Sequence, residues 1–154
     1  MTTVLAYGHT ERIRIHYDDL DAMGIVHNAR YALLLERALT AYWEQRGFSF
    51  ADGRPTLPDS FHAVVEFTIN YRAPIRGTGD VAIHFWLDSF GRSSGVYGFT
   101  ITSADGATTH AEGHRTIVRL DPGTMRPTAW TEAAREVAAS LLKPAALVGA
   151  EEAS

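Results

Sequence analysis

The feature that most restricts the fold of this chain is a long helical pattern in its first third. From about Ala29, apolar residues recur at three- and four-residue spacings, which is the period of one helix face. They are Tyr31, Leu34, Leu35, Ala38, Leu39, Tyr42 and Trp43. Leu33 widens the apolar face, and Gly47 follows as a C-terminal stop signal. The pattern therefore predicts a central helix that other structure covers on more than one side.

Most of the remaining chain is typical of β-strands. Residues 11–17 alternate between polar and apolar side chains, which is the period of a half-buried strand. Four further strand-like runs follow the helix, at residues 62–72, 81–90, 95–102 and 108–120. Successive strands with short connections favour an antiparallel sheet. The sequence therefore predicts an α+β fold in which one sheet packs on one helix, but the pattern does not determine the strand order.

The chain reads as one domain over residues 1–154, with a core at about 10–130. Residues 48–60 contain Gly53, Pro55 and Pro58, which indicates a loop. The segment 131–154 begins with a short helix that Thr131 caps, and continues as an alanine-rich tail that we expect to be frayed.

Composition excludes several classes of function. The 154 residues are 45% hydrophobic and carry a net charge of −4, so we expect no nucleic-acid partner. The absence of cysteine excludes disulfides, thiolate metal sites and a cysteine nucleophile. No segment has the length of a membrane span, and the first residues do not resemble a secretory signal. We therefore expect a soluble cytoplasmic protein.

The junction between the first strand and the helix is the strongest candidate for an active site. Asp18, Asp19 and Asp21 lie within four positions, shortly before a helix start. The free N–H groups of a helix start carry partial positive charge. A carboxylate beside such N–H groups can attack a carbonyl that they polarise.

In this junction the chain resembles the hot-dog-fold thioesterases of the 4-hydroxybenzoyl-CoA thioesterase type. The family pattern is an aromatic residue, Asp-x-Asp-x-x-Gly-hydrophobic-Val, a polar or aromatic pair, and a tyrosine at the helix start. The matching segments are Tyr17, Asp19–Val26, His27-Asn28, Tyr31, Glu36-Arg37-Ala38, Tyr71-Arg72-Ala73-Pro74, Gly79-Asp80 and Gly91-Arg92-Ser93-Ser94. The resemblance covers roughly residues 10–130 in order.

The resemblance implies a hot-dog fold, in which an antiparallel β-sheet wraps around a long central α-helix. It also implies a homodimer or homotetramer that joins sheets edge to edge, with the active site at the subunit interface. The implied reaction is the hydrolysis of an acyl-CoA without metal or cofactor, with aromatic or medium-chain acyl groups as first candidates. Edge-to-edge pairing would protect an exposed edge strand.

The same resemblance assigns three catalytic positions. Asp21 matches the catalytic carboxylate, acting as nucleophile or as general base on water; its alternative role is a turn or cap residue. The backbone N–H of Asn28 matches the oxyanion position, while its side chain is expected to cap the helix. Tyr17 orients the carboxylate or the acyl group, unless it is a core tyrosine. Asp19 is expected to be structural and Asp18 solvated.

Other positions are implied to contact substrate. The expected substrate-binding residues are Gly24, His27, Tyr31, Arg92, Ser93 and Ser94, with the last three at the nucleotide end. Gly24 is also compatible with a simple turn that needs a positive φ. One branch of the family has histidine at the position of Asn28, and that role cannot be transferred to His27.

Charged residues outside the junction have simpler predicted roles. Glu36 is expected to be a structural ion-pair partner or to support the site indirectly. Arg115 is one of several candidates for a coenzyme A phosphate, with an ordinary solvated strand-end arginine as the alternative. The histidines at 62, 84, 110 and 114 lack metal-ligand spacing and are expected on the sheet surface, so we expect no metal site.

Three alternative functions remain open at the level of sequence. The thioester could be carried by an acyl carrier protein instead of coenzyme A. A hot-dog enoyl-CoA hydratase or dehydratase pairs a histidine with an acid, but the stretch from Asp21 to His27 lacks the Asn-Pro of that motif and is one residue too long. A non-catalytic acyl-CoA-binding protein is the third, and the presence of Asp21 argues against it.

Overall fold

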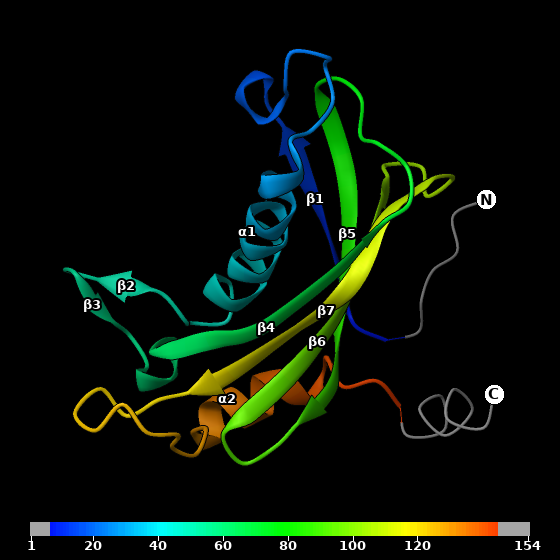
Figure 1. The fold of residues 1–154 in the computed structure, drawn as a ribbon. Helices are drawn as coiled ribbons and strands as arrows, with labels where there is room; N and C mark the ends of the chain where they lie inside the picture. Colours follow the sequence, from blue (N-terminus) through cyan, green and yellow to red (C-terminus); the bar gives the residue numbers. More distant parts are fainter. Residues whose placement is uncertain (1–6, 145–154) are drawn as a thin grey trace.

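A five-stranded antiparallel sheet and one long helix form most of the molecule (Figure 1). The structure is a computed structural model that describes residues 7–144. The main elements are β1 (His9–Ile15), α1 (Tyr31–Glu44), β4 (His62–Tyr71), β5 (Gly79–Phe90), β6 (Ser94–Ser103), β7 (Thr109–Arg119) and α2 (Glu132–Ala139). A two-residue hairpin, β2 (Phe50–Ala51) and β3 (Arg54–Pro55), and 3₁₀ turns at Tyr17–Asp19, Asn28–Arg30 and Pro58–Ser60 complete the chain.

The sheet confirms the predicted antiparallel arrangement and supplies the order that the pattern did not contain. The strands lie in the order β1-β5-β6-β7-β4, so β1 and β4 form the two edges. β4 therefore pairs with β7, a strand far from it in sequence, whereas β5, β6 and β7 form a meander. The predicted loop at 48–60 contains the β2–β3 hairpin, and the predicted frayed tail lies mostly outside the described residues.

The core lies between α1 and the inner face of the sheet. Period-two alternation points Ile83, Phe85 and Leu87 of β5 inward, and all three are fully buried. α1 contributes Leu34, Leu35 and Ala38 to this core, together with other residues at the same helical spacing. Burial of this apolar surface is the main term that holds α1 against the sheet.

One flank of the sheet and helix lies open in the single chain. Leu33 on α1 is exposed, so the prediction that the helix is covered on more than one side is not met within one chain. On β4, Val64, Val65 and Tyr71 are also exposed, in contrast to the buried inward residues of β5. An edge strand with free backbone groups and apolar side chains is a ready site for pairing with another chain.

The far end of the core is closed by α2. Thr131 caps this helix as predicted, because its Oγ1 accepts a hydrogen bond from Ala134 N at 3.2 Å. Asp59 is buried beside the cap and accepts bonds from Thr131 N at 2.9 Å and from Thr131 Oγ1 at 2.6 Å. After α2, Leu87 N donates to Leu141 O at 2.8 Å, which attaches the chain to β5.

Candidate active site

The loop between β1 and α1 is held at the sheet end where β1 and β5 meet (Figure 1). Two backbone bonds attach it to the segment after β4: Val26 N donates to Ile75 O at 2.9 Å, and Gly77 N donates to Gly24 O at 2.8 Å. The loop therefore has a defined shape, although much of its surface is exposed.

Asp19 supports this loop from within. Its side chain is buried, and its Oδ2 accepts a hydrogen bond from His16 N at 2.8 Å. Its Oδ1 lies 4.0 Å from Arg30 Nη1 and 3.9 Å from Arg37 Nη1, so two guanidinium groups partly balance its charge. The predicted structural role of Asp19 is confirmed, and Asp18 is exposed as expected.

Asp21 uses its two carboxylate oxygens differently. Oδ1 accepts hydrogen bonds from Met23 N at 2.8 Å and Ile25 N at 3.2 Å, so the alternative role as a turn residue is present. No hydrogen bond from the described residues reaches Oδ2. The side chain is partly exposed, which leaves that oxygen accessible to a ligand or to water. One oxygen thus fixes the orientation of the other.

Gly24 allows the tight turn after Asp21. Its φ is 74°, in the left-handed region that favours glycine, and its N–H donates to Asp21 O at 3.0 Å. A Cβ built at Gly24 would meet no atom within 4 Å, so the backbone conformation, and not crowding, requires glycine. This space in front of the loop is also compatible with the close approach of a ligand.

The helix start differs from prediction in one respect. A 3₁₀ turn at Asn28–Arg30 leads into α1, and the His27 side chain caps it, with Nδ1 accepting from Ala29 N at 3.3 Å. The prediction that the Asn28 side chain caps the helix is therefore wrong, because the cap lies one residue earlier. Asn28 is the first residue of the turn, so its N–H has no acceptor within the turn.

The tyrosines at the site occupy two very different environments. Tyr17 is 88% exposed, so the alternative of a core tyrosine is wrong, and no hydrogen bond joins it to Asp21 within residues 7–144. Tyr31 is buried, which raises its pKa, and it packs edge-on against Tyr71 with ring centroids 5.0 Å apart. Tyr71 OH in turn donates to Asn28 O at 3.3 Å. Tyr31 thus supports the helix start through its contact with Tyr71.

The Arg92-Ser93-Ser94 turn is not brought to Asp21 within one chain. It lies beyond Phe90, whereas the Asp21 loop lies near Gly79, at the other end of β5. At about 3.3 Å per residue, this strand separates the two by roughly 35 Å along its length. Arg92 O instead accepts a hydrogen bond from Trp130 N at 2.9 Å, next to α2.

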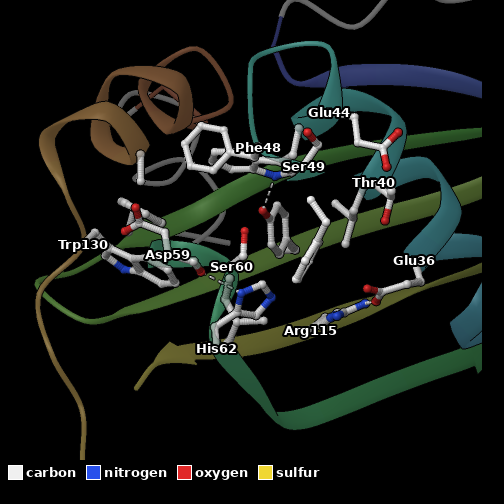
Figure 2. Close-up of a pocket in the computed structure, with 17 residues that line it drawn as sticks. Glu36, Thr40, Glu44, Phe48, Ser49, Asp59, Ser60, His62, Arg115 and Trp130 are labelled. Carbon is white, nitrogen blue, oxygen red and sulfur yellow. Dashed lines mark hydrogen bonds and ion pairs between the residues drawn. The ribbon is translucent and has the colours of Figure 1, made fainter. Parts of the chain in front are cut away.

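A cavity of about 240 Å³ lies between the C-terminal half of α1, the inner face of the sheet and the start of α2 (Figure 2). Aromatic side chains form much of its wall: Trp43, Phe48, Phe50, Phe90, Tyr97 and Trp130. The ion pair between Glu36 and Arg115 lies at one end (Figure 2). No lining residue comes from the Asp21 loop.

Arg115 is the main residue that the sequence reasoning placed wrongly. It is only 7% exposed and pairs with Glu36 across the helix–sheet interface, so it is not a solvated strand-end arginine. The prediction that Glu36 is an ion-pair partner is confirmed. In β7, period two places Arg115 on the same side of the strand as Gly113 and Ile117, and the structure buries all three.

The strand histidines divide between the surface and the interior. His62 and His114 are exposed as predicted, whereas His84 and His110 are buried and contradict the prediction. His110 Nδ1 lies 3.1 Å from Ala73 O. Within residues 7–144 no three His, Asp or Glu side chains come together as a possible metal site. No helix in that range is long and apolar enough to cross a membrane.

Comparison with known proteins is consistent across sequence and structure. Residues 23–110 match the family described as the thioesterase superfamily. The acyl-CoA thioester hydrolase YbgC of Escherichia coli is 30% identical over 118 residues, which cover 76% of this chain and 85% of that protein. A thioesterase from Thermus thermophilus, solved with coenzyme A and zinc, is 28% identical; it has a TM-score of 0.70 over 88% of this chain and 95% of that chain.

The fold is also that of the PA5185 protein of Pseudomonas aeruginosa, with a TM-score of 0.76 at 24% identity. That match covers 90% of this chain and 94% of the other. The 1,4-dihydroxy-2-naphthoyl-CoA thioesterase Slr0204 of Synechocystis has the same fold at 13% identity, with a TM-score of 0.75 over 88% of this chain and 98% of that chain.

Proposed function

As a member of the thioesterase superfamily with the hot-dog fold, this chain is a thioester hydrolase, and we propose that it cleaves acyl-CoA at the loop that carries Asp21. The observation that carries the proposal is that one fixed loop presents both a carboxylate oxygen and a backbone N–H without partners in the loop. Asp21 Oδ2 is accessible while Oδ1 is held by Met23 N and Ile25 N, and the Asn28 N–H begins the helix without an acceptor in its turn.

These two groups match the two demands of thioester hydrolysis. The Asn28 N–H donates to the carbonyl oxygen, where negative charge develops during attack. In a nucleophilic route, Asp21 Oδ2 bonds to the carbonyl carbon, the C–S bond breaks and the thiolate takes a proton. Water then hydrolyses the anhydride to the acid and restores the carboxylate.

A general-base route uses the same residues. Asp21 Oδ2 takes a proton from a water molecule while the water oxygen bonds to the carbonyl carbon. The C–S bond then breaks, and the thiolate leaves as the thiol after it receives a proton. Both routes consume one water and yield the free acid and coenzyme A, and both place Asp21 at the reacting atoms.

We also propose that the active enzyme is an edge-to-edge homodimer. The exposed apolar side chains of Val64 and Val65 on the free edge of β4, and the exposed Leu33 on α1, support this assembly. Such pairing would cover the open flank. The dimer would also add residues of the second chain to the site. The Arg92–Ser94 turn of that chain could then contact a ligand bound at the Asp21 loop of this one.

A panel of acyl-CoA thioesters, followed by release of free thiol, tests the proposed activity. We expect thiol release from coenzyme A esters, with kcat/KM depending on the acyl group. The same acyl groups on an acyl carrier protein form the second arm of the panel. Hydrolysis of the carrier-bound esters alone would contradict the proposed acyl-CoA substrate, and an absence of hydrolysis in both arms would contradict the proposed function.

A further inference from the structure

Arg115 is a charged residue with apolar or aromatic cross-strand neighbours on the face of the sheet that packs against α1. In the strand register it lies beside Tyr97 of β6 on one side and Phe67 of β4 on the other. All three therefore point toward α1, and Arg115 is almost completely buried there. A guanidinium in such surroundings loses hydration, which is costly unless its N–H groups are paired.

The pairing of this guanidinium is incomplete. Nη1 donates to Glu36 Oε2 of α1, and Figure 2 shows the two groups facing each other at the edge of the cavity. Nε is buried and has no hydrogen-bond acceptor among the described residues. The Glu36 side chain is 49% exposed, so water reaches one side of the pair while the Nε side is dry. One N–H of a buried cation thus lacks a partner.

Tyr97 supplies a second donor next to it. Its hydroxyl oxygen accepts a hydrogen bond from Trp43 Nε1 at 2.8 Å. Burial raises the pKa of Tyr97, so the hydroxyl keeps its proton at neutral pH and can still donate it. Tyr97 and Arg115 both line the cavity and are direct cross-strand neighbours, with Tyr97 bonded to Trp43 and Arg115 bonded to Glu36 of the same helix.

The charges around the cavity indicate which acceptor suits these donors. Glu36, Glu44 and Asp59 all line it, whereas Arg115 is its single lining cation among the described residues. Asp59 is balanced by Arg119, whose Nε lies 3.8 Å from Asp59 Oδ1. A carboxylate on the ligand would still meet the charges of Glu36 and Glu44 in a partly dry site. An uncharged carbonyl oxygen accepts the same hydrogen bonds without that repulsion, and the aromatic wall suits the carbon chain around it.

We infer that this cavity receives the distal part of the acyl group, and that Arg115 and Tyr97 select acyl groups with an uncharged carbonyl oxygen there. The inference rests on the proposed function, since it assigns the substrate class of the same enzyme. Glu36 lies five residues after Tyr31, so at about 1.5 Å per residue it lies roughly 7.5 Å along α1 from the helix start. An acyl chain spans that distance from a thioester held at the start of the same helix.

A matched set of eight-carbon thioesters tests the inference. It comprises octanoyl-CoA, the oxooctanoyl-CoA isomers with the ketone at successive positions beyond the third carbon, and octanedioyl-CoA. We expect the best ketone isomer to exceed octanoyl-CoA in kcat/KM by about tenfold or more, because it pairs buried donors that octanoyl-CoA leaves unpaired. Octanedioyl-CoA should be the poorest of the set.

Two variants separate selection from a purely structural role. Tyr97→Phe removes one donor at nearly constant shape, and Arg115→Met removes the other at similar length. In each, the ketone-to-octanoyl ratio of kcat/KM should fall towards one, whereas a structural role would lower both substrates alike and leave the ratio unchanged. Arg126→Met, at an exposed position away from the cavity, is the matched control and should keep both the ratio and the rates.

The outcomes distinguish this inference from the proposed function. If octanoyl-CoA is hydrolysed as fast as every ketone isomer, the selection by Arg115 and Tyr97 is wrong and thioesterase activity stands. An unchanged ratio in Tyr97→Phe, the variant that best preserves shape, also overturns it. If no member of the set releases thiol although other acyl-CoA esters of the panel do, the inference is contradicted and the proposed function stands.

Discussion

Asp21 has one oxygen in the turn and a second oxygen that is free for the chemistry we propose, so the two alternatives from the sequence do not exclude each other. Its Oδ1 closes the turn through Met23 N and Ile25 N, and its Oδ2 receives no hydrogen bond from the described part of the chain. The two roles are compatible because a carboxylate has two oxygens with separate lone pairs. A turn role for an aspartate therefore does not argue against catalysis at the same residue.

Asp21→Asn should lower kcat for acyl-CoA hydrolysis at least about a hundredfold. The amide oxygen of asparagine can still accept the two backbone bonds of the turn, but the amide is neither a nucleophile nor a base. Thiol release measures the rate, and thermal unfolding checks that the fold persists. Asp18→Asn, at an exposed neighbouring position, should retain the wild-type rate. Near-normal turnover in Asp21→Asn would remove Asp21 from the reaction.

The role of Asn28 can be divided between its backbone and its side chain. Asn28→Pro removes the N–H at the first residue of the turn, a position where proline is tolerated. We expect a loss of about 10²–10³ in kcat if this N–H stabilises the oxyanion. Asn28→Ala keeps the N–H and should lose much less. Equal kcat values for the two variants, measured by the same thiol assay, would contradict the assignment.

At the scale of elements, β1 and β5 meet at a buried histidine. Thr10 Oγ1 lies 2.8 Å from His84 Nδ1, while His84 Nε2 is buried without a partner in the described chain. Burial lowers the pKa of His84, and the neighbouring His9 adds to the effect. A hydrogen bond with the Tyr7 backbone opposes part of this shift, but burial is the larger cause and the pKa remains lowered.

This histidine should make folding stability depend on pH. Its pKa is lower in the folded chain than its ordinary value of 6.5, so the unfolded chain binds the proton more readily. The contribution is fully present above about pH 6.5 and is lost as the pH falls below that value. Urea unfolding between pH 8 and pH 5 measures it. His84→Gln should show a shallower fall in the free energy of unfolding, and an equal slope would exclude His84 as the cause.

At the scale of the whole molecule, the flank along β4 is the part of the fold where apolar side chains and an edge strand remain uncovered. Val65 is 59% exposed on this edge, and a single charged residue on an edge strand blocks pairing with another strand. Val65→Lys should therefore convert the proposed dimer to a monomer in light scattering, with a fall in kcat/KM of about tenfold or more because the site is shared. Ala107→Lys, in the exposed β6–β7 turn, is the control. A wild-type enzyme that is monomeric and fully active would contradict the shared site.

Local features of this protein were determined by its sequence alone. The helical spacing from Tyr31 onward, the period-two strands and the left-handed turn at Gly24 all follow from steric and burial preferences that act over a few residues. For the same reason, the Asp21 junction could be proposed as a candidate site before the fold was known. The structural role of Asp19 likewise follows from its place in a turn.

The tertiary structure decided which side of each strand and helix is buried, and by which residues. Strand alternation does not determine whether Arg115 points toward the core or toward solvent. The pairing of β4 with β7, and the packing of α1 on this face, bury it against Glu36. The helix cap is His27 and not the predicted Asn28. The path of the loop is set by long-range backbone bonds to Ile75 and Gly77, and it places the His27 side chain at the start of the turn. The length of β5 separates the Asp21 loop from the Arg92 turn. Each of these depends on contacts between residues far apart in sequence, which a local pattern does not contain.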